Sequence, residues 1–415
     1  MRISLPPGNL LPRSFLSLFL DLFLASFLFT TLFAHAEEPT IKIGIIGPFT
    51  GKSSSDMGES IRGGARVFLH DINQIGGVLG RRIELIERDD QAKPEVGVNM
   101  ARDLVEKEKV IAVVGFANTG VAIPSSKIFQ DAKIPLIVSA ATGVNVTKQF
   151  MPPAQATSYI FRVAASDELQ PIAILNDVID KRKLTNIAIL HDDSPYGQFG
   201  KQGLLAELQK RKIQALAVES FKVGDHDMSA QLNKASQAGA QVIILYCLSN
   251  EAAMVANSMK KLKLAIPLTG SWTLSHKSFM DLSGANGEGA RMPLTFIENT
   301  SSSRSSAFTL SYYKINNVSQ MPSAVAAAQT YDALRLLTLA LMQANSTDGS
   351  KIREALEDMK YEATSTVISR YKKPFSKTDH EAIGMNMLVI GEVHKGKVNY
   401  VYKEDANSSL IVRTK

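Results

Sequence analysis

The sequence predicts an α/β protein in which parallel sheets, covered by helices on both faces, form two domains. Short apolar runs rich in β-branched residues alternate with segments of helical periodicity, which is typical of βαβ units with right-handed crossovers. The first run, 41–47, ends in a Gly/Pro/Thr turn at 47–51, and a helical pattern follows over 57–75. The chain has 415 residues, more than one hydrophobic core usually holds, so we expect two domains.

The alternation continues along most of the chain. Apolar runs predict further strands at 83–87, 110–115, 135–139, 159–163, 186–190, 214–219, 241–246 and 266–268. Helical periodicity predicts helices at 95–107, 121–132, 169–178, 199–210, 229–237 and 251–262. Beyond Arg291 the sequence becomes more helical, most clearly at 324–342 and 351–359, and the serine-rich segment 301–306 is typical of a loop.

Residues 1–36 have the pattern of a secretory signal peptide. Arg2 and Arg13 supply positive charge before and beside an apolar run at 15–33, and Ala34-His35-Ala36 forms an A-x-A cleavage site. We expect cleavage after Ala36 and export to the periplasm. The alternative is an uncleaved anchor, because the apolar run is nearly long enough to span a bilayer.

Composition and charge argue against nucleic-acid binding and against disulfides. The net charge of +6 is spread along the chain, whereas nucleic acids require a concentrated basic face. Cys247 is the only cysteine and lies in an apolar run, so we expect a buried, unpaired thiol.

Some segments resemble nucleotide-binding or metal-binding motifs, but each lacks a required residue or geometry, and no catalytic motif is present. The segment 47–53 resembles a P-loop, but Ile46 replaces its first glycine and Pro48 removes a backbone donor. Ile46 also breaks the dinucleotide fingerprint. His191-Asp192-Asp193 offers metal-binding side chains, but neighbours on an extended chain point in opposite directions, so a solvated turn is the preferred interpretation. We expect no enzyme activity, no cofactor and no metal.

Small and hydroxyl-bearing residues follow two of the predicted strands. Thr119 lies where a helix opens after 110–115, and its hydroxyl and the free N–H groups of the first turn would attract an anion. After the next strand, Ala140 and Ala141 allow a ligand to approach the backbone, and Thr142 adds a second hydroxyl. Together they could hold a carboxylate. The alternative is ordinary loop and helix-cap chemistry.

Several short motifs follow one another in a characteristic order and spacing. They are IGIIGPFTG at 43–51, GGA at 63–65, DIN at 71–73, GGVLG at 76–80, RDD at 88–90, PLIVSAAT at 135–142 and HDDSPYG at 191–197. In this set the chain resembles the leucine/isoleucine/valine-binding protein family, the periplasmic receptors of amino-acid ABC importers. The resemblance extends from about Thr40 to the C-terminus and is weakest after Arg291.

The resemblance implies two Rossmann-like α/β lobes, joined by a three-stranded hinge, that close on a ligand. Lobe one would take residues 37–161 and 295–366, and lobe two residues 162–294 and 367–415. The implied partners are a small carboxylate and the permease and ATPase subunits of an ABC importer, and we expect a monomer. An alternative is a receptor of the same fold that senses a ligand and signals.

The resemblance also implies which residues hold the ligand. Thr119, the backbone near Ala140, and Thr142 match the positions that bind the ligand carboxylate in lobe one. Tyr196 matches a tyrosine that closes on the ligand from lobe two.

Other ligand positions depart from the family pattern. The acidic residue that pairs with the ammonium of an amino acid falls at Trp272, Leu248 replaces an aromatic, and Met57 stands where an aromatic often packs. An unpaired ammonium in a dry cleft is costly, and cation–π attraction to Trp272 would recover only about 0.5–2 kcal/mol. The possible ligands are apolar amino acids, branched-chain keto acids and aromatic acids. The missing partner for an ammonium group favours a keto acid or an aromatic acid. The alternative is that Trp272 is a core residue and that the acid comes from elsewhere, for example Glu251.

Overall fold

The structure, a computed structural model, describes residues 1, 4, 39–51, 54–298 and 303–408. The chain divides into a short unit, Met1–Pro39, and a compact unit, Thr40–Lys415, which contains the fold. The apolar run and the cleavage site of the predicted signal peptide lie outside the described residues. Within the described ranges, no helix combines the length and the apolarity needed to cross a bilayer.

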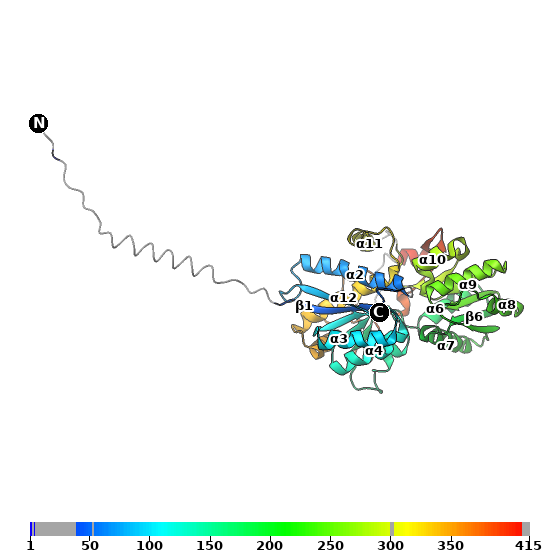
Figure 1. Cartoon of the computed structure of the whole chain (residues 1–415), viewed down its shortest axis with the longest axis horizontal. Coiled ribbons are helices and arrows are strands. Elements are labelled where there is room, and N and C mark those ends of the chain that lie inside the picture. The colour runs from blue at the N-terminus through cyan, green and yellow to red at the C-terminus, as the bar shows by residue number, and fades with distance from the viewer. Residues whose placement is uncertain (2–3, 5–38, 52–53, 299–302, 409–415) are drawn as a thin grey trace. The chain divides into compact units, whose positions relative to one another are not determined.

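The first sheet is parallel throughout, with strand order β2-β1-β3-β4-β5 (Figure 1). Its strands are β1 (Ile41–Gly47), β2 (Ile83–Asp89), β3 (Ala112–Gly115), β4 (Leu136–Val138) and β5 (Ile160–Arg162). The helices between them are α2 (Ser55–Gln74), α3 (Pro94–Glu106), α4 (Thr119–Ala132) and α5 (Asn145–Lys148). Ile43 of the central strand β1 pairs with both Leu85 and Ala112. Such a strand is covered on both faces, which explains its nearly continuous apolar sequence.

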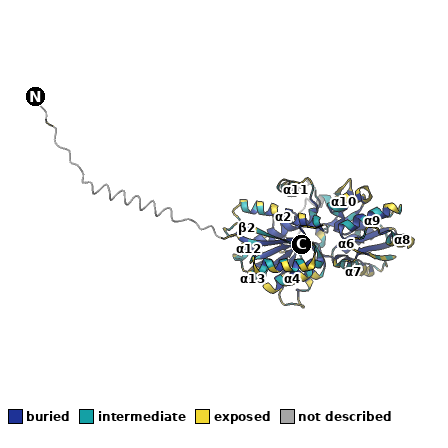
Figure 2. Cartoon of the chain, viewed as in Figure 1, coloured by how far each residue is buried: buried dark blue, intermediate teal, exposed yellow. Residues whose placement is uncertain are grey.

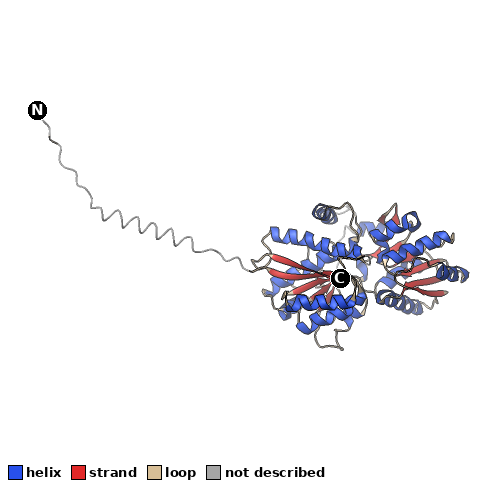
Figure 3. Ribbon diagram, in the orientation of Figure 1, coloured by secondary structure: helices blue, strands red, loops and turns tan. Residues whose placement is uncertain are grey.

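The second sheet has the order β12-β11-β10-β9-β8-β6-β7. Its parallel part contains β6 (Ile187–Asp192), β7 (Ala217–Phe221), β8 (Val242–Tyr246), β9 (Leu268–Gly270) and β10 (Arg291–Leu294). The elements between β5 and β10 are α6 (Gln170–Leu175), η1 (Asn176–Lys181), α7 (Pro195–Lys210), α8 (Ser229–Gln237), α9 (Ser249–Lys261), η2 (Trp272–Ser275), α10 (Lys277–Ser283) and η3 (Gly284–Gly287). In Figure 3 the strands of each sheet lie between helices.

After β10 the chain returns to the first sheet through α11 (Ser303–Asn316), α12 (Ala324–Ala344) and α13 (Gly349–Glu357). Both α11 and α12 pack against α2. The approach of α12 requires a glycine, because a Cβ atom at Gly64 would lie 2.3 Å from the carbonyl oxygen of Ala327. The chain then passes η4 (Met385–Met387) and ends in β11 (Val389–His394), β12 (Lys397–Tyr400) and α14 (Lys403–Ser408).

The buried residues follow the predicted pattern. Figure 2 shows the strands of both sheets as buried and the exposed residues mainly on the helices that cover them. The alternation of strands and helices up to about residue 270 confirms the predicted fold class, with boundaries that differ by a few residues.

The C-terminal third differs from the prediction in two respects. Helix α11 begins at Ser303, so the part of the serine-rich segment that the structure describes is helical, because the buried Phe308 and Tyr312 anchor this helix to the core. β10, β11 and β12 occupy a region predicted as mainly helical, and β11 and β12 are antiparallel. Their hairpin turns at Lys395 and Gly396, which both have positive φ, as a two-residue type I′ turn requires.

Candidate functional site

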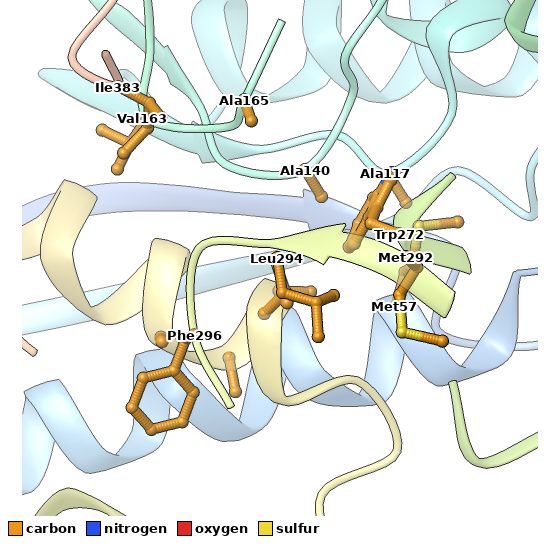
Figure 4. Packing of buried hydrophobic residues seen from close by; sticks show 14 of the residues in the cluster. Met57, Ala117, Ala140, Val163, Ala165, Trp272, Met292, Leu294, Phe296 and Ile383 are labelled. Carbon is orange, nitrogen blue, oxygen red and sulfur yellow. The ribbon is translucent and has the colours of Figure 1, made fainter. Parts of the chain in front are cut away.

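A cavity of about 230 Å³ of atom-free space lies where strands of both sheets end. Its lining residues all follow the carboxyl ends of strands, which is where parallel sheets bind ligands. They are Met57, Ala117, Asn118, Thr119, Ala140, Thr142, Tyr196, Leu248, Trp272 and Thr273. Figure 4 shows Met57, Ala117 and Trp272 close together at this place.

The cavity brings together most of the residues predicted from the sequence. Thr119, Ala140 and Thr142 come from the first sheet and its loops, and Tyr196, Leu248 and Trp272 come from the second, while Met57 lies on α2. Ala141 does not line the cavity. Its N–H donates to the Phe116 carbonyl at 3.0 Å, and its side chain packs in the core.

Three lining residues were not predicted: Ala117, Asn118 and Thr273. Each is within two residues of a predicted site residue, Thr119 or Trp272, in the same loop. Their position directly after a strand could have identified them, because the residues that follow the carboxyl end of a parallel strand face the ligand crevice.

Four helices begin at the cavity wall. α4 starts at Thr119 and α7 at Pro195, next to Tyr196, while α2 starts two residues before Met57 and α9 directly after Leu248. A helix N-terminus carries roughly half a positive charge and free N–H groups. The four N-termini therefore make the cavity favourable for an anion.

Three side-chain donors in the cavity wall have no protein partner. The hydroxyls of Thr142 and Tyr196 and the indole N–H of Trp272 are buried and make no hydrogen bond within the described chain. The Asn118 side-chain oxygen is also unpaired. Each unpaired buried polar group costs about 1–3 kcal/mol. A ligand that accepts hydrogen bonds would remove much of that cost.

Thr119 is fixed in place by the neighbouring loop. Its Oγ1 accepts a hydrogen bond from the Gly143 N–H at 3.1 Å. A Cβ atom at Gly143 would lie 2.2 Å from Thr119 Cγ2, so only glycine allows this approach. Since Oγ1 acts as acceptor in this bond, its hydrogen is free for another partner.

A buried carboxylate lies behind Thr142. The backbone N–H of Asp167 donates to the Thr142 carbonyl at 2.9 Å, and its side chain accepts from the Tyr246 hydroxyl. Burial raises the pKa of Asp167 to about 6, although hydroxyls of Tyr246 and Thr142 oppose this shift. Thr142 Oγ1 is thus within electrostatic reach of Asp167, but not in hydrogen-bonding geometry. Gln170 connects this carboxylate to the cavity, because its side chain donates to Asp167 and accepts from the backbone N–H of Trp272.

The prediction of a solvated turn at 191–193 is wrong for Asp192. Its side chain is fully buried and accepts hydrogen bonds from the backbone N–H groups of Ser194 and Leu248, at 3.1 and 2.9 Å. Burial raises the pKa of Asp192 to about 6, against the effect of these hydrogen bonds. Asp192 therefore positions Leu248 in the cavity wall. Across the described part of the chain, no three His, Cys, Asp or Glu side chains are grouped to hold a metal.

Cys247 precedes Leu248 and is a free, buried cysteine, as predicted. Its backbone carbonyl accepts a hydrogen bond from Thr273 Oγ1 at 2.7 Å. Burial raises the pKa of the Cys247 thiol well above its ordinary value.

Two α/β sheets whose strand ends share one small, anion-favouring cavity define a class of protein that captures solutes. The chain belongs to the periplasmic binding protein family, whose sequence profile matches residues 40–397. Its fold is the type I periplasmic binding protein fold, as similar solved structures show. This membership confirms the resemblance seen in the sequence and the expectation of a binding protein that is not an enzyme.

Sequence relatives support this family, and solved structures share its fold. The chain is 26% identical to a Leu/Ile/Val-binding protein homolog from Brucella melitensis over 329 residues, covering 79% of this chain and 86% of the relative. It is similar in fold to a branched-chain amino acid transporter substrate-binding protein from Streptococcus pneumoniae in complex with isoleucine, with a TM-score of 0.75, 24% identity and coverage of 87% and 98%. An ABC transporter solute-binding protein from Rhodopseudomonas palustris in complex with 4-hydroxybenzoate matches with a TM-score of 0.73, 18% identity and coverage of 87% and 95%.

Proposed function

We propose that the protein is an extracytoplasmic solute-binding receptor of an ABC importer of the branched-chain amino acid type. It captures a small carboxylate in the cavity between its lobes and presents it to the permease and ATPase subunits. The predicted signal peptide supports the location, and the names of similar proteins, among them a Leu/Ile/Val-binding protein homolog, support the transporter class.

The single observation that carries the proposal is the excess of unpaired donors in a cavity with four helix N-termini. A carboxylate has two oxygens that accept several hydrogen bonds. It would pair with Thr142, Tyr196 and Trp272, and its charge would suit the helix dipoles. The Thr119 hydroxyl adds a further donor from the start of α4.

The lining also favours a ligand that has no amino group beside its carboxylate. None of the described side chains that line the cavity is a carboxylate. Asp167, the buried acid behind Thr142, does not line the cavity; its Oδ1 accepts from Tyr246, and its Oδ2 is unpaired among the described residues. We therefore propose a branched-chain keto acid or an aromatic acid as ligand, with its apolar part against Met57 and Trp272. The isoleucine and 4-hydroxybenzoate complexes of similar folds show that this fold holds both kinds of acid.

Capture would occur by closure of lobe one, 37–161 with 295–366, on lobe two, 162–294 with 367–415. Among the hydrogen bonds that connect the proposed lobes, two come from the start of α10. The Ser278 N–H donates to Asp56 Oδ2 at 2.8 Å, and the Lys277 N–H donates to the Pro322 carbonyl at 2.9 Å. A ligand that contacts both lobes would favour this closed arrangement.

Calorimetric titration of ligand-stripped protein tests the proposal. The panel contains leucine, isoleucine, valine, their 2-keto acids, and benzoate-type acids. Tight binding of keto or aromatic acids with no response to the amino acids is the expected result. Tight leucine or valine binding would refute the choice of a ligand without an α-amino group, and no binding by any acid would refute carboxylate capture. Trp272, the only tryptophan in the chain, provides an independent fluorescence readout from the cavity itself.

A further inference from the structure

A second cavity adjoins the first on the side of α9. It encloses about 910 Å³ of atom-free space, including its mouth. Val223, Met254 and Leu282 give it apolar walls. Its ionisable lining residues are Asp225, His226 and Glu251. Nothing in the proposed carboxylate site uses this space.

The two cavities have a common wall. Leu248 lines both of them, and Asp192 fixes its backbone through the 2.9 Å hydrogen bond to its N–H. Asn118 of the first cavity donates to Ser54 Oγ of the second at 2.8 Å. The boundary between the cavities therefore contains the Leu248 side chain and the hydrogen bond between Asn118 and Ser54.

Glu251 has an unused acceptor in the second cavity. The side chain is 7% exposed. One carboxylate oxygen, Oε1, accepts from the Gly224 N–H at 2.9 Å, and the other, Oε2, is buried without a hydrogen-bond partner. A buried charged group with a missing partner is costly, so such a group usually serves a ligand, an ion or a water.

Helix capping alone does not account for this arrangement. Glu251 lies in the first turn of α9, where a negative charge interacts favourably with the helix dipole. That interaction is available to an exposed side chain and does not require burial. Glu251 lines the second cavity, and its buried, unpaired Oε2 atom is what points to a ligand.

We propose that the ligand site continues past Leu248 into the second cavity, and that Glu251 accepts a hydrogen bond from the far end of the ligand. The ligand is then a carboxylate with an apolar body that carries a hydroxyl or an amino group opposite its acid group. This inference rests on the proposed function, since the acid group must be held in the first cavity. It adds a second polar contact, which selects among carboxylates of similar size.

Matched pairs of acids test the inference. Phenylacetate is compared with 4-hydroxyphenylacetate, and 4-methylbenzoate with 4-(aminomethyl)benzoate, by calorimetry on the purified protein. The first pair measures the effect of a neutral hydroxyl donor, and the second pair measures the effect of a cationic ammonium donor. We expect the donor-bearing member of at least one pair to bind about tenfold to a hundredfold more tightly, as a hydrogen bond to a charged group allows.

Two variants locate the contact. Glu251→Gln should reduce the preference to less than about threefold, because one of its two acceptor positions becomes a donor. Asp225→Asn changes a carboxylate of the same cavity that already accepts from the Lys222 N–H at 2.8 Å, so it should retain the wild-type preference.

The outcomes separate the two proposals. Equal affinity for both members of each pair, or an unchanged preference in Glu251→Gln, would overturn this inference while carboxylate capture stands. Failure of every acid to bind would overturn both. The wild-type preference requires no variant, so the inference is refutable even if Glu251→Gln does not fold.

Discussion

Replacing Thr142 by valine should weaken ligand binding without weakening the fold. The Thr142 side chain is 3% exposed and its hydroxyl makes no hydrogen bond within the described residues. Valine has nearly the same shape, so the change removes an unpaired buried hydroxyl that costs about 1–3 kcal/mol. The free energy of unfolding should therefore stay the same or rise by about 1 kcal/mol. The bound complex, in contrast, loses a hydrogen bond to a carboxylate, worth about 1.5–3 kcal/mol, or roughly tenfold to a hundredfold in Kd.

The assay pairs urea unfolding of the ligand-free protein with calorimetry using the tightest acid of the panel. Thr309→Val is the matched control, because Thr309 also has a buried, unpaired hydroxyl but lies on α11 and does not line the cavity. It should change stability in the same direction and leave Kd unaltered. Thr119→Val should lower both stability and affinity, because its hydroxyl already accepts from Gly143.

Two results would refute this reasoning. If Thr142→Val kept the wild-type Kd within about twofold, the hydroxyl would not contact the ligand. If it lost more than about 1 kcal/mol of stability, the hydroxyl would have a partner in the folded protein, with Asp167 as the nearest candidate.

Three other substitutions test the fold and its closure. Burial raises the pKa of Asp90 to about 7, so the folded protein holds a proton that the unfolded chain releases near pH 4, and stability falls as pH rises from about 4 to 7. Asp90→Asn should flatten that fall in urea unfolding at pH 4.5, 6 and 8, and an unchanged slope would contradict it. Asp56→Ala removes the acceptor of the Ser278 N–H and should weaken binding about fivefold to thirtyfold; unchanged binding would mean that this contact does not stabilise the closed state. Gly64→Ala should destabilise the fold by about 1–3 kcal/mol, through contact with α12, and a variant of wild-type Tm would contradict the packing described here.

The parallel core was predictable because its strands carry their own signal. A strand covered on both faces must be mostly apolar, and β1, β3, β6 and β8 are, apart from Lys42 in β1 and the last two residues of β6, His191 and Asp192. Most cavity residues were also predictable, since loops after such strands line the crevice. The family resemblance then identified Thr119, Thr142 and Tyr196 among the residues of these loops.

The rest depended on tertiary contacts that a local pattern does not contain. Strands β11 and β12 are short, and their pairing is recognisable mainly through the turn at Lys395 and Gly396. Asp192 looks like an exposed turn residue in the sequence, and only the folded chain brings the Leu248 N–H to it from a distant strand. Likewise, the open acceptor of Glu251 results from the surrounding elements, and its type and position in α9 predict only a helix cap.

The position of Cys247 matters for a protein that is proposed to work outside the cytoplasm. In an oxidising compartment a lone thiol can join two chains, or react with small oxidants, if its sulfur is reached as a thiolate. Here the side chain is 1% exposed and the thiol pKa is raised far above its ordinary value by burial, so the reactive form is scarce and sheltered. Once folded, the protein should therefore resist covalent dimerisation through Cys247, even at high concentration in an oxidising medium.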